Sequence, residues 1–218
     1  MQLYHCLSAR SFRPLWMLEE MGLPYELKVL PFPPRAFDKS YFDVNPLGTV
    51  PFLIDGDARM SESAAICQYL GVRYGPTPLA VAPDEADYPR YLNWLAMSDA
   101  TLTFPQTLVL RYRMLEPAER RQPQVADDYE KWFLGRMRAV ETAMEKSDYL
   151  CAGRFTAADI AVGYAAMLAE IIGLAPQFTP GVAAWWERLK QRDGYKKAIA
   201  AQSAAAKAQG VPSWAPKA

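Results

Sequence analysis

The sequence predicts an α/β amino-terminal domain with the element order βαβ–ββα, followed by an all-α carboxy-terminal domain. Residues 1–75 alternate between strand-like and helix-like segments, and a Val-Pro pair there precedes a tight hairpin. A stretch rich in glycine and proline follows at residues 75–83, and beyond it the apolar periodicity is helical. We therefore expect domains at 1–76 and 85–208, joined by a linker at 77–84 and followed by a tail at 209–218.

The first three elements are expected to be a strand, a helix and a second strand. Residues 2–7 alternate as a strand, residues 12–21 carry apolar side chains at helical spacing and end before Gly22, and residues 25–30 alternate again. Two strands joined through a helix run parallel with a right-handed crossover, so this is a βαβ unit. The proline-rich segment 31–47 is expected to be irregular, with a short helix near residues 37–42.

A hairpin and a helix complete the first domain. Residues 52–54 and 58–60 are short strand-like segments separated by a turn that contains Asp55-Gly56, which favours an antiparallel pair. The segment 64–74 then has the periodicity of an amphipathic helix.

The remaining chain is expected to be helical. A long pattern over 84–115 contains Pro105, which should kink or divide it, and a further helix is predicted over 124–147. Thr156 and Asp159 have the spacing of a capping box and should begin a very apolar helix that ends near residue 172. Further helices are predicted over 179–191 and 195–207.

Composition argues against several classes of function. Lysine plus arginine equals aspartate plus glutamate at 24 each, so no net charge draws the protein to nucleic acid. The start lacks a basic segment followed by an apolar run, and no uninterrupted apolar stretch reaches roughly 18 residues, so we expect a cytoplasmic protein without a membrane partner. The three cysteines are widely separated and His5 is the only histidine, which argues against disulfides and a metal site.

One stretch has the features of a ligand platform. Pro51 has no amide hydrogen and pushes Val50 toward extended geometry, so Val50 can present its backbone N–H and C=O to a bound ligand. Ser61, Glu62 and Ser63 stand where a helix begins, and its unpaired amides and partial positive charge suit a carboxylate. Together these features predict a peptide-like ligand that carries a carboxylate.

Four motifs in this order resemble the glutathione S-transferase superfamily, in particular its serine-type classes. They are Ser8-x-x-Ser11-x-Arg13, Asn45-Pro46-x-Gly48-x-Val50-Pro51, Glu62-Ser63-x-Ala65-Ile66 and Phe155-Thr156-x-x-Asp159. Each motif is weak alone, but the set is specific, and the resemblance extends from residue 1 to about residue 200. It implies a thioredoxin-like first domain with a cis Pro51, a helical domain that binds the second substrate, and a homodimer.

The resemblance also implies a role for each platform residue. The backbone of Val50, held by Pro51, would pair with the cysteinyl part of glutathione, the co-substrate. Glu62 and Ser63 would hold its γ-glutamyl end, with the side chain of one binding the ammonium and the hydroxyl of the other binding the carboxylate.

A serine hydroxyl is expected to donate a hydrogen bond to the glutathione sulfur. By resemblance to the tau and zeta classes, Ser8 is the first candidate to donate a hydrogen bond to the glutathione thiolate, Ser11 is the second, and Tyr4 is a third. A thiol of pKa near 8.5 is only about 3% ionised at neutral pH, and one charge-assisted hydrogen bond worth roughly 1.5–3 kcal/mol lowers that pKa by about one to two units. Arg10 or Arg13 could add positive charge. Alignment suggests that Arg10 stands where the beta class has a cysteine, which disfavours cysteine chemistry.

Structural roles remain open for these residues. Without the surrounding motifs, Ser8 and Ser11 would be a loop serine and a helix-cap serine, and Glu62 an acid favoured by the helix dipole. Trp94, Phe104, Tyr112 and Trp214 could line an acceptor pocket, although most aromatic stripes belong to a core.

The leading function is conjugation of glutathione to an apolar electrophile. A specialised glutathione-dependent isomerase, dehalogenase or ether-cleaving lyase is an alternative, although Ala9-Arg10 replaces the serine-cysteine that usually follows the first serine in zeta-class isomerases. A non-enzymatic binding or scaffold protein is the other alternative.

Overall fold

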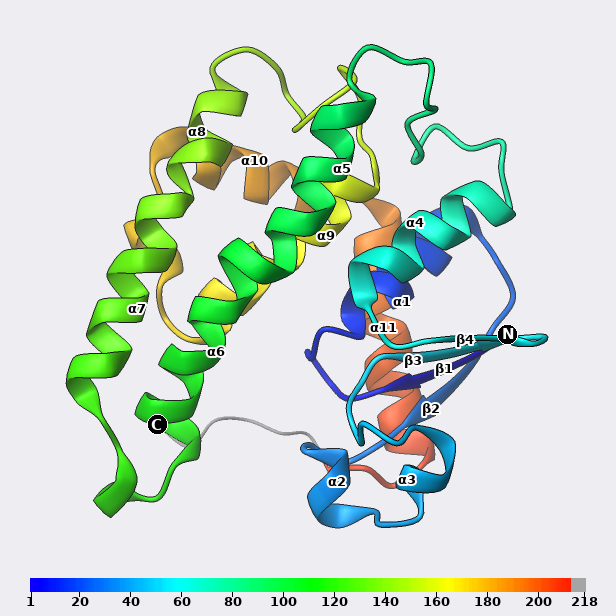
Figure 1. Ribbon diagram of the computed structural model, residues 1–218, viewed down its shortest axis with the longest axis vertical. Coiled ribbons are helices and arrows are strands. Elements are labelled where there is room, and N and C mark those ends of the chain that lie inside the picture. The colour runs from blue at the N-terminus through cyan, green and yellow to red at the C-terminus, as the bar shows by residue number, and fades with distance from the viewer. Residues whose placement is uncertain (213–218) are drawn as a thin grey trace. The chain divides into compact units, whose positions relative to one another are not determined.

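The computed structural model describes residues 1–212, which form two compact units (Figure 1). The first comprises Met1–Thr77 together with the described residues from Lys190 onward, and the second comprises Pro78–Leu189. The predicted fold class is confirmed, because a four-stranded sheet with helices occupies the amino-terminal part and the second unit is helical.

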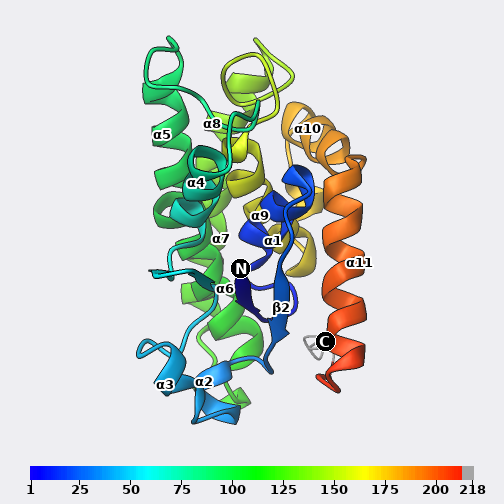
Figure 2. The same cartoon turned by 90° about the vertical axis from the view of Figure 1, so that its right-hand side faces the viewer.

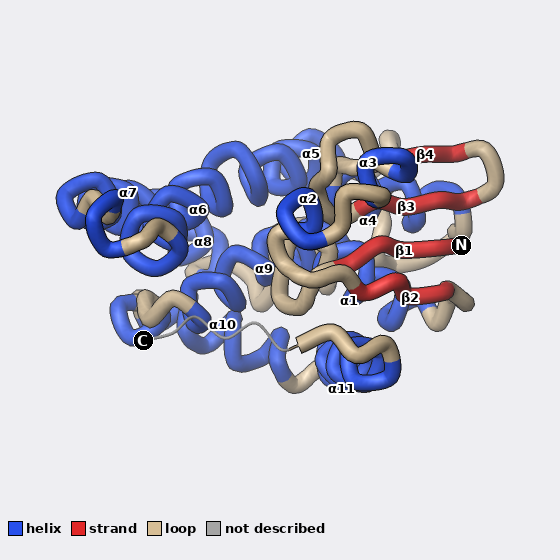
Figure 3. The backbone as a smooth tube through the Cα atoms, turned by 90° about the horizontal axis from the view of Figure 1, so that it is seen from below, coloured by secondary structure: helices blue, strands red, loops and turns tan. Residues whose placement is uncertain are grey.

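The sheet of the first unit has the strand order β2-β1-β3-β4, and Figure 3 shows the four strands side by side. Its strands are β1 (Gln2–His5), β2 (Glu26–Val29), β3 (Phe52–Asp55) and β4 (Ala58–Met60). β1 and β2 are parallel, as predicted for a βαβ unit, and β3 is antiparallel to both β1 and β4. The hairpin prediction is therefore confirmed.

Two helices of the first unit pack together on one side of this sheet (Figure 1). α1 (Phe12–Met21) has the predicted bounds and ends at Gly22, whose φ of 62° is left-handed. α4 (Ser63–Arg73) follows β4. The proline-rich segment differs from its prediction, because it forms two single turns, α2 (Pro34–Phe37) and α3 (Tyr41–Val44). Pro34 is tolerated at the first turn of a helix, where its missing N–H costs nothing.

The last helix, α11 (Asp193–Ala208), packs against α1 and β2 of the first unit (Figure 2). Arg192, just before it, donates two hydrogen bonds of 2.8 Å to the Glu20 carboxylate at the end of α1. Gln209, just after it, accepts from Val29 N–H at 2.9 Å and donates to the Leu27 carbonyl at 2.8 Å. Both ends of α11 are thus attached to the first unit, whereas the sequence grouped this segment with the helical domain over 85–208. Helical periodicity identifies a helix without identifying the surface that it covers.

The tail predicted at 209–218 is described only as far as residue 212. Gln209 is attached to β2, and residues 213–218, with the candidate lining residue Trp214, lie outside the described part of the chain.

The second unit is built from helices around one apolar helix. Its elements are α5 (Tyr88–Met97), η1 (Ser98–Thr103), α6 (Phe104–Leu110), η2 (Arg111–Leu115), η3 (Ala118–Arg120), α7 (Pro123–Arg136), α8 (Arg138–Met144), α9 (Ala157–Ile171), η4 (Ala175–Gln177) and α10 (Pro180–Lys190). Pro105 divides its helical pattern as predicted, with the π-helical segments η1 and η2 on either side of α6. The helix predicted over 124–147 is divided into α7 and α8. Within residues 1–212 no helix is long and apolar enough to cross a membrane.

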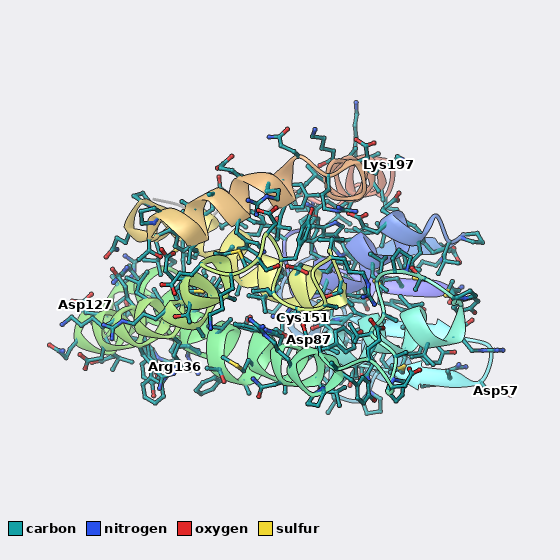
Figure 4. All side chains as sticks on the ribbon, turned by 90° about the horizontal axis from the view of Figure 1, so that it is seen from above. Asp57, Asp87, Asp127, Arg136, Cys151 and Lys197 are labelled. Atoms are coloured by element: carbon teal, nitrogen blue, oxygen red, sulfur yellow. The ribbon has the colours of Figure 1, made fainter. Side chains whose placement is uncertain are left out.

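The buried helix α9 begins with the predicted capping box. The Thr156 side chain accepts from Ala158 N–H at 3.2 Å, and the Asp159 side chain accepts from Thr156 N–H at 3.0 Å. The turn before α9, which contains Cys151 and Ala152, is attached to the rest of the helical unit by Asp87. The Asp87 carboxylate accepts a hydrogen bond from Ala152 N–H at 2.5 Å, and Figure 4 shows Asp87 beside Cys151. Every residue from Ala157 to Ala169 is buried, so α9 forms the core of its unit.

Candidate functional site

The predicted site residues come together at one edge of the sheet. Tyr4 on β1 lies opposite Phe52 on β3, and Leu53 lies opposite Met60 on β4. Because these pairs are antiparallel, the loop after β1, the chain before β3 and the chain after β4 all leave the sheet at the same edge. Ser8 and Ser11 lie in the first of these segments, Val50 and Pro51 in the second, and Glu62 and Ser63 in the third.

The turn before β3 is fixed by Asn45. Its side-chain amide donates to the Thr49 carbonyl at 2.8 Å, and its side-chain oxygen accepts from Leu47 N–H at 3.1 Å. The Tyr41 hydroxyl also donates to the Thr49 carbonyl at 2.8 Å. Gly48 has a φ of 59°, and a β-carbon on it would lie 2.7 Å from the Phe42 ring. The asparagine and the glycine of this motif therefore both shape the turn that delivers Val50.

Val50 presents an unpaired backbone. The Val50–Pro51 peptide bond is cis, as the resemblance implied, and the Pro51 ring is buried. Within residues 1–212 neither the N–H nor the C=O of Val50 has a hydrogen-bond partner, whereas β3 is paired from Phe52 onward. Val50 can therefore receive a strand-like segment of a ligand.

A buried arginine stands behind the start of α4. Glu62 is the exposed residue that precedes the helix, and Ser63 is its first residue, only 4% exposed. The Arg13 guanidinium on α1, which is fully buried, donates to Ser63 Oγ at 2.8 Å. This contact adds a full positive charge to the partial charge of the helix amides, so the site favours an anion at Ser63.

The two candidate serines of the first loop differ in their surroundings. Ser11 is fully buried, and its hydroxyl lies 3.2 Å from Cys6 N–H and 3.4 Å from the Cys6 carbonyl, so it accepts from and donates to one residue's backbone. Ser8 is half-buried and has a φ of 55°, a left-handed conformation that costs a non-glycine residue about 1–2 kcal/mol. Such conformations occur where surrounding structure holds a functional residue in place.

Two polar residues for which the sequence predicted no role in the site, His5 and Gln202, lie beneath this loop. Oε1 of Gln202, on α11, accepts from Ser8 N–H at 3.0 Å and lies 3.0 Å from Nε2 of His5. Burial lowers the pKa of His5 to about 4, against the opposing effect of its hydrogen bond to Gln202, so His5 is neutral near pH 7. Gln202 interrupts the buried alanines Ala198 and Ala206 at four-residue spacing, and a buried amide in an apolar stripe is the signal that could have identified it.

The other predicted candidates have structural surroundings. The Tyr4 ring packs against Tyr41 and Phe52, with ring centres 5.4 Å and 6.5 Å away. Burial raises the pKa of Cys6 to about 12, which leaves its thiol protonated and poorly nucleophilic. Trp94 is 5% exposed and donates to the Leu150 carbonyl, which places it in the core of the helical unit. Among residues 1–212 no group of three or more potential ligand residues could hold a metal ion.

Comparison with known proteins agrees with this geometry. Residues 7–73 match the family described as Glutathione S-transferase, N-terminal domain, and residues 105–193 match Glutathione S-transferase, C-terminal domain. The chain is 37% identical over 100 residues to "Glutathione S-transferase 3" of Schizosaccharomyces pombe, a match that covers 46% of this chain and 41% of the relative. It is 26% identical over 204 residues to "Glutathione S-transferase 3" of Zea mays, which covers 89% of this chain and 90% of the relative.

Solved structures share the same fold. The glutathione transferase URE2P6 from Phanerochaete chrysosporium, solved in complex with oxidized glutathione, superimposes with a TM-score of 0.83 and 25% identity. That match covers 94% of this chain and 96% of the other.

Proposed function

Because the chain belongs to the glutathione S-transferase superfamily, we propose that it is a glutathione transferase that joins the thiolate of glutathione to an apolar electrophile. The observation that carries the proposal is the unpaired backbone of Val50 at the same sheet edge as the Arg13–Ser63 contact. An extended peptide with a terminal carboxylate has the groups that this edge can satisfy.

In the proposed complex, glutathione lies along this edge. The backbone of Val50 exchanges hydrogen bonds with its cysteinyl residue, and Pro51 holds Val50 extended. The hydroxyl of Ser63 and the first amides of α4 bind the γ-glutamyl carboxylate, supported by the charge of Arg13. The Glu62 carboxylate binds the ammonium, which its exposure beside Ser63 favours.

We assign the thiolate-stabilising hydrogen bond to Ser8 rather than to Ser11. The Ser11 hydroxyl is fully buried and engaged with the Cys6 backbone, whereas Ser8 is half-buried and held in a left-handed conformation. Donation from the Ser8 hydroxyl lowers the thiol pKa, so the thiolate is available at neutral pH. The thiolate attacks the electrophilic carbon, a C–S bond forms, and the electron pair leaves with the displaced group or moves into the acceptor's π-system.

We assign the electrophile to the helical unit, around residues 102–113. Within that segment Phe104 has an exposed ring (52%), which is the kind of apolar surface that such an acceptor requires.

The test is the Ser8→Ala variant, with Ser11→Ala as its control. Ser8→Ala should raise the pKa of enzyme-bound glutathione thiol by about one to two units and lower turnover at neutral pH by roughly 10-fold to 100-fold. Ser11→Ala should lower stability without moving this pKa. Thiolate absorbance against pH measures the shift, and an unchanged pKa in Ser8→Ala would rule out its role.

Two assays of the wild-type protein, binding to immobilised glutathione and turnover of a generic electrophile, distinguish the three functional classes. A general transferase binds immobilised glutathione and turns over a generic electrophile. Binding without such turnover indicates a specialised isomerase, dehalogenase or lyase, and absence of binding indicates a scaffold protein.

A homodimer in the cytoplasm completes the proposal. The three cysteines are free and buried, as suits a compartment that keeps thiols reduced. On α4, Val72 is 73% exposed beside a depression lined by Met60, Ala65, Gln68, Tyr69 and Arg73, and a second copy of the chain would cover this surface. Sedimentation of the wild type and of Val72→Glu tests the dimer, and a monomeric wild type would contradict it.

A further inference from the structure

We propose that Gln202 is a positioning residue, which holds the backbone of Ser8 so that its hydroxyl faces the glutathione sulfur. This inference rests on the proposed function, because it gives Ser8 the role assigned above. Gln202 lies 194 residues from Ser8 in the sequence, on α11, and its oxygen is 3.0 Å from Ser8 N.

The conformation of Ser8 requires external support. Ala9 N–H donates to the Cys6 carbonyl at 3.1 Å, so residues 6–9 form a β-turn with Ser8 at its third position. With a φ of 55°, that position normally favours glycine, because other residues clash with their own backbone there. The N–H of Ser8 points out of the turn and meets the Gln202 side chain, so this hydrogen bond opposes rotation of Ser8 into a more relaxed conformation.

The hydrogen-bonding pattern fixes the orientation of the Gln202 amide. A backbone N–H can only donate, so the group of Gln202 that faces Ser8 must be its carbonyl oxygen. The same oxygen lies 3.0 Å from Nε2 of His5, which must therefore carry its proton on Nε2. The amide cannot flip without placing its own N–H against the Ser8 N–H, so the oxygen that holds Ser8 has one stable orientation.

The support beneath the oxygen is rigid. His5 is fully buried on β1, Gln202 is 4% exposed, and α11 is attached to the first unit at both ends through Arg192 and Gln209. Since His5 is neutral near pH 7, the three groups place no net charge below the sulfur. Gln202 thus acts on Ser8 through geometry.

Gln209→Met is a matched control for Gln202→Met. Both glutamines lie on the last helix or directly after it, and both contact backbone of the first unit, but Gln209 contacts β2 and not the Ser8 loop. Methionine keeps the length of the side chain and removes the acceptor oxygen. Comparison of the two variants therefore separates loss of anchoring from loss of Ser8 positioning.

The expected result is a change in chemistry specific to Gln202. Gln202→Met should raise the pKa of bound glutathione thiol by about one unit and lower kcat about tenfold below that pKa, with the KM for glutathione changed less than about twofold. Gln209→Met should lower the melting temperature and leave the thiol pKa unchanged. Equal thiol pKa values in the wild type and Gln202→Met, or equal shifts in both variants, would overturn the inference.

The Ser8→Ala variant separates failure of this inference from failure of the proposed function. If Ser8→Ala leaves the thiol pKa unchanged, the role of Ser8 is wrong. If Ser8→Ala shifts it and Gln202→Met does not, only the inference is wrong. In a Ser8→Ala background, Gln202→Met should add no further shift, because the hydroxyl that it positions is gone.

A measurement on the wild type decides the case if Gln202→Met does not fold. The Ser8 amide proton should exchange with solvent roughly 100-fold more slowly than in an unstructured peptide, since its partner is a buried side chain. Exchange at the unprotected rate would show that Gln202 does not hold it.

Discussion

A fully buried guanidinium behind the first residue of α4 changes the role expected of Arg13. The sequence offered Arg13 and Arg10 as sources of positive charge for the sulfur. In the structure Arg13 donates to Ser63 and so supplies its charge at the proposed carboxylate site. Because that charge acts at the carboxylate, its effect should be on affinity more than on thiol ionisation.

Ser63→Ala should therefore weaken glutathione binding about 10-fold to 100-fold, which corresponds to a hydrogen bond to a charged group worth roughly 1.5–3 kcal/mol. The thiol pKa should remain that of the wild type. Titration calorimetry measures the affinity. Ser61→Ala is the control, since within residues 1–212 Ser61 has no hydrogen-bond partner; a comparable loss of affinity in that variant would reject the role of Ser63.

At this scale the local geometry of the proposed platform residues could be predicted from the sequence, but the contacts that support them could not. Val50, Pro51, Glu62 and Ser63 belong to continuous segments whose local geometry follows from proline and from a helix start. Gln202 contacts Ser8 only because α11 returns to the sheet, and no local pattern contains that information. The destination of Arg13 likewise depends on the packing of α1 against α4.

Among the elements, the turn over residues 45–49 can be compared with the turn between β3 and β4, because each contains a glycine in the left-handed conformation. Gly48 and Gly56 have nearly the same φ, 59° and 58°, but a β-carbon at Gly48 would lie 2.7 Å from Phe42, whereas one at Gly56 would have no neighbour within 4 Å. The left-handed conformation penalises alanine at both positions. Only at Gly48 would the added β-carbon also collide with a neighbouring side chain and force the turn to shift.

Gly56→Ala should therefore destabilise the protein by about 1 kcal/mol, and Gly48→Ala by about 2 kcal/mol or more. Gly48→Ala should also raise the KM for glutathione, because Val50 follows the displaced turn. Urea denaturation and steady-state kinetics measure the two effects. Equal loss of stability and unchanged KM in both variants would contradict the role of this turn.

The start of α9 gives stability an unusual dependence on pH. Burial raises the pKa of Asp159 to about 6, although Trp185, Leu150 and Thr156 all donate hydrogen bonds to its carboxylate. An unfolded aspartate titrates near 3.9, so between these values the folded state binds the proton more readily. Asp159 therefore contributes stability that is fully present below about pH 4 and is lost as the pH rises to about 6.

Relative to Asp159→Asn, which cannot titrate, the wild type should lose about 2 kcal/mol of unfolding free energy between pH 4 and pH 7. At pH 7 the variant should be the less stable protein, because the ionised wild-type carboxylate offers two acceptor oxygens and asparagine offers one. Denaturant titrations at several pH values measure the difference. A gap between the two proteins that stays constant or widens with pH would contradict the raised pKa.

Elements were predicted best where the pattern is local. α1 has its predicted bounds because a long apolar periodicity ends at a glycine, and α9 begins at its predicted capping box. The prediction failed at the division between α7 and α8, which falls at Met137, two residues after Gly135. Glycine weakens a helix interior, so a local signal for this break was present and was not used. The two single turns α2 and α3 are too short for periodicity to detect.

At the scale of the whole molecule, chain order and compact units do not coincide. The first unit is completed by residues from Lys190 onward, and α11 packs against α1 and β2. Tyr195 meets Trp16 edge to face at 5.0 Å, and Glu20 receives Arg192. The sheet and its first helices are thus incomplete without the last helix.

A fragment of residues 1–77 should therefore lack a cooperative thermal transition. The same fragment fused through a long flexible linker to residues 190–212 should regain one, because the fusion restores the apolar surface that covers α1. Circular dichroism with temperature measures both. A cooperative transition in the shorter fragment would show that α11 is dispensable for folding of this unit.

The return of α11 to the first unit also has a consequence during synthesis. Ala208, at the end of α11, is made 131 residues after Thr77, so at about 5–20 residues per second the ribosome needs roughly 7–26 seconds to supply the helix that covers α1 and β2. Through that interval the nascent β2 and the surface of α1 that α11 later covers remain open to other chains. Folding of the first unit during its own synthesis is therefore limited, because residues 190–208 must be made before residues 1–77 can become fully native.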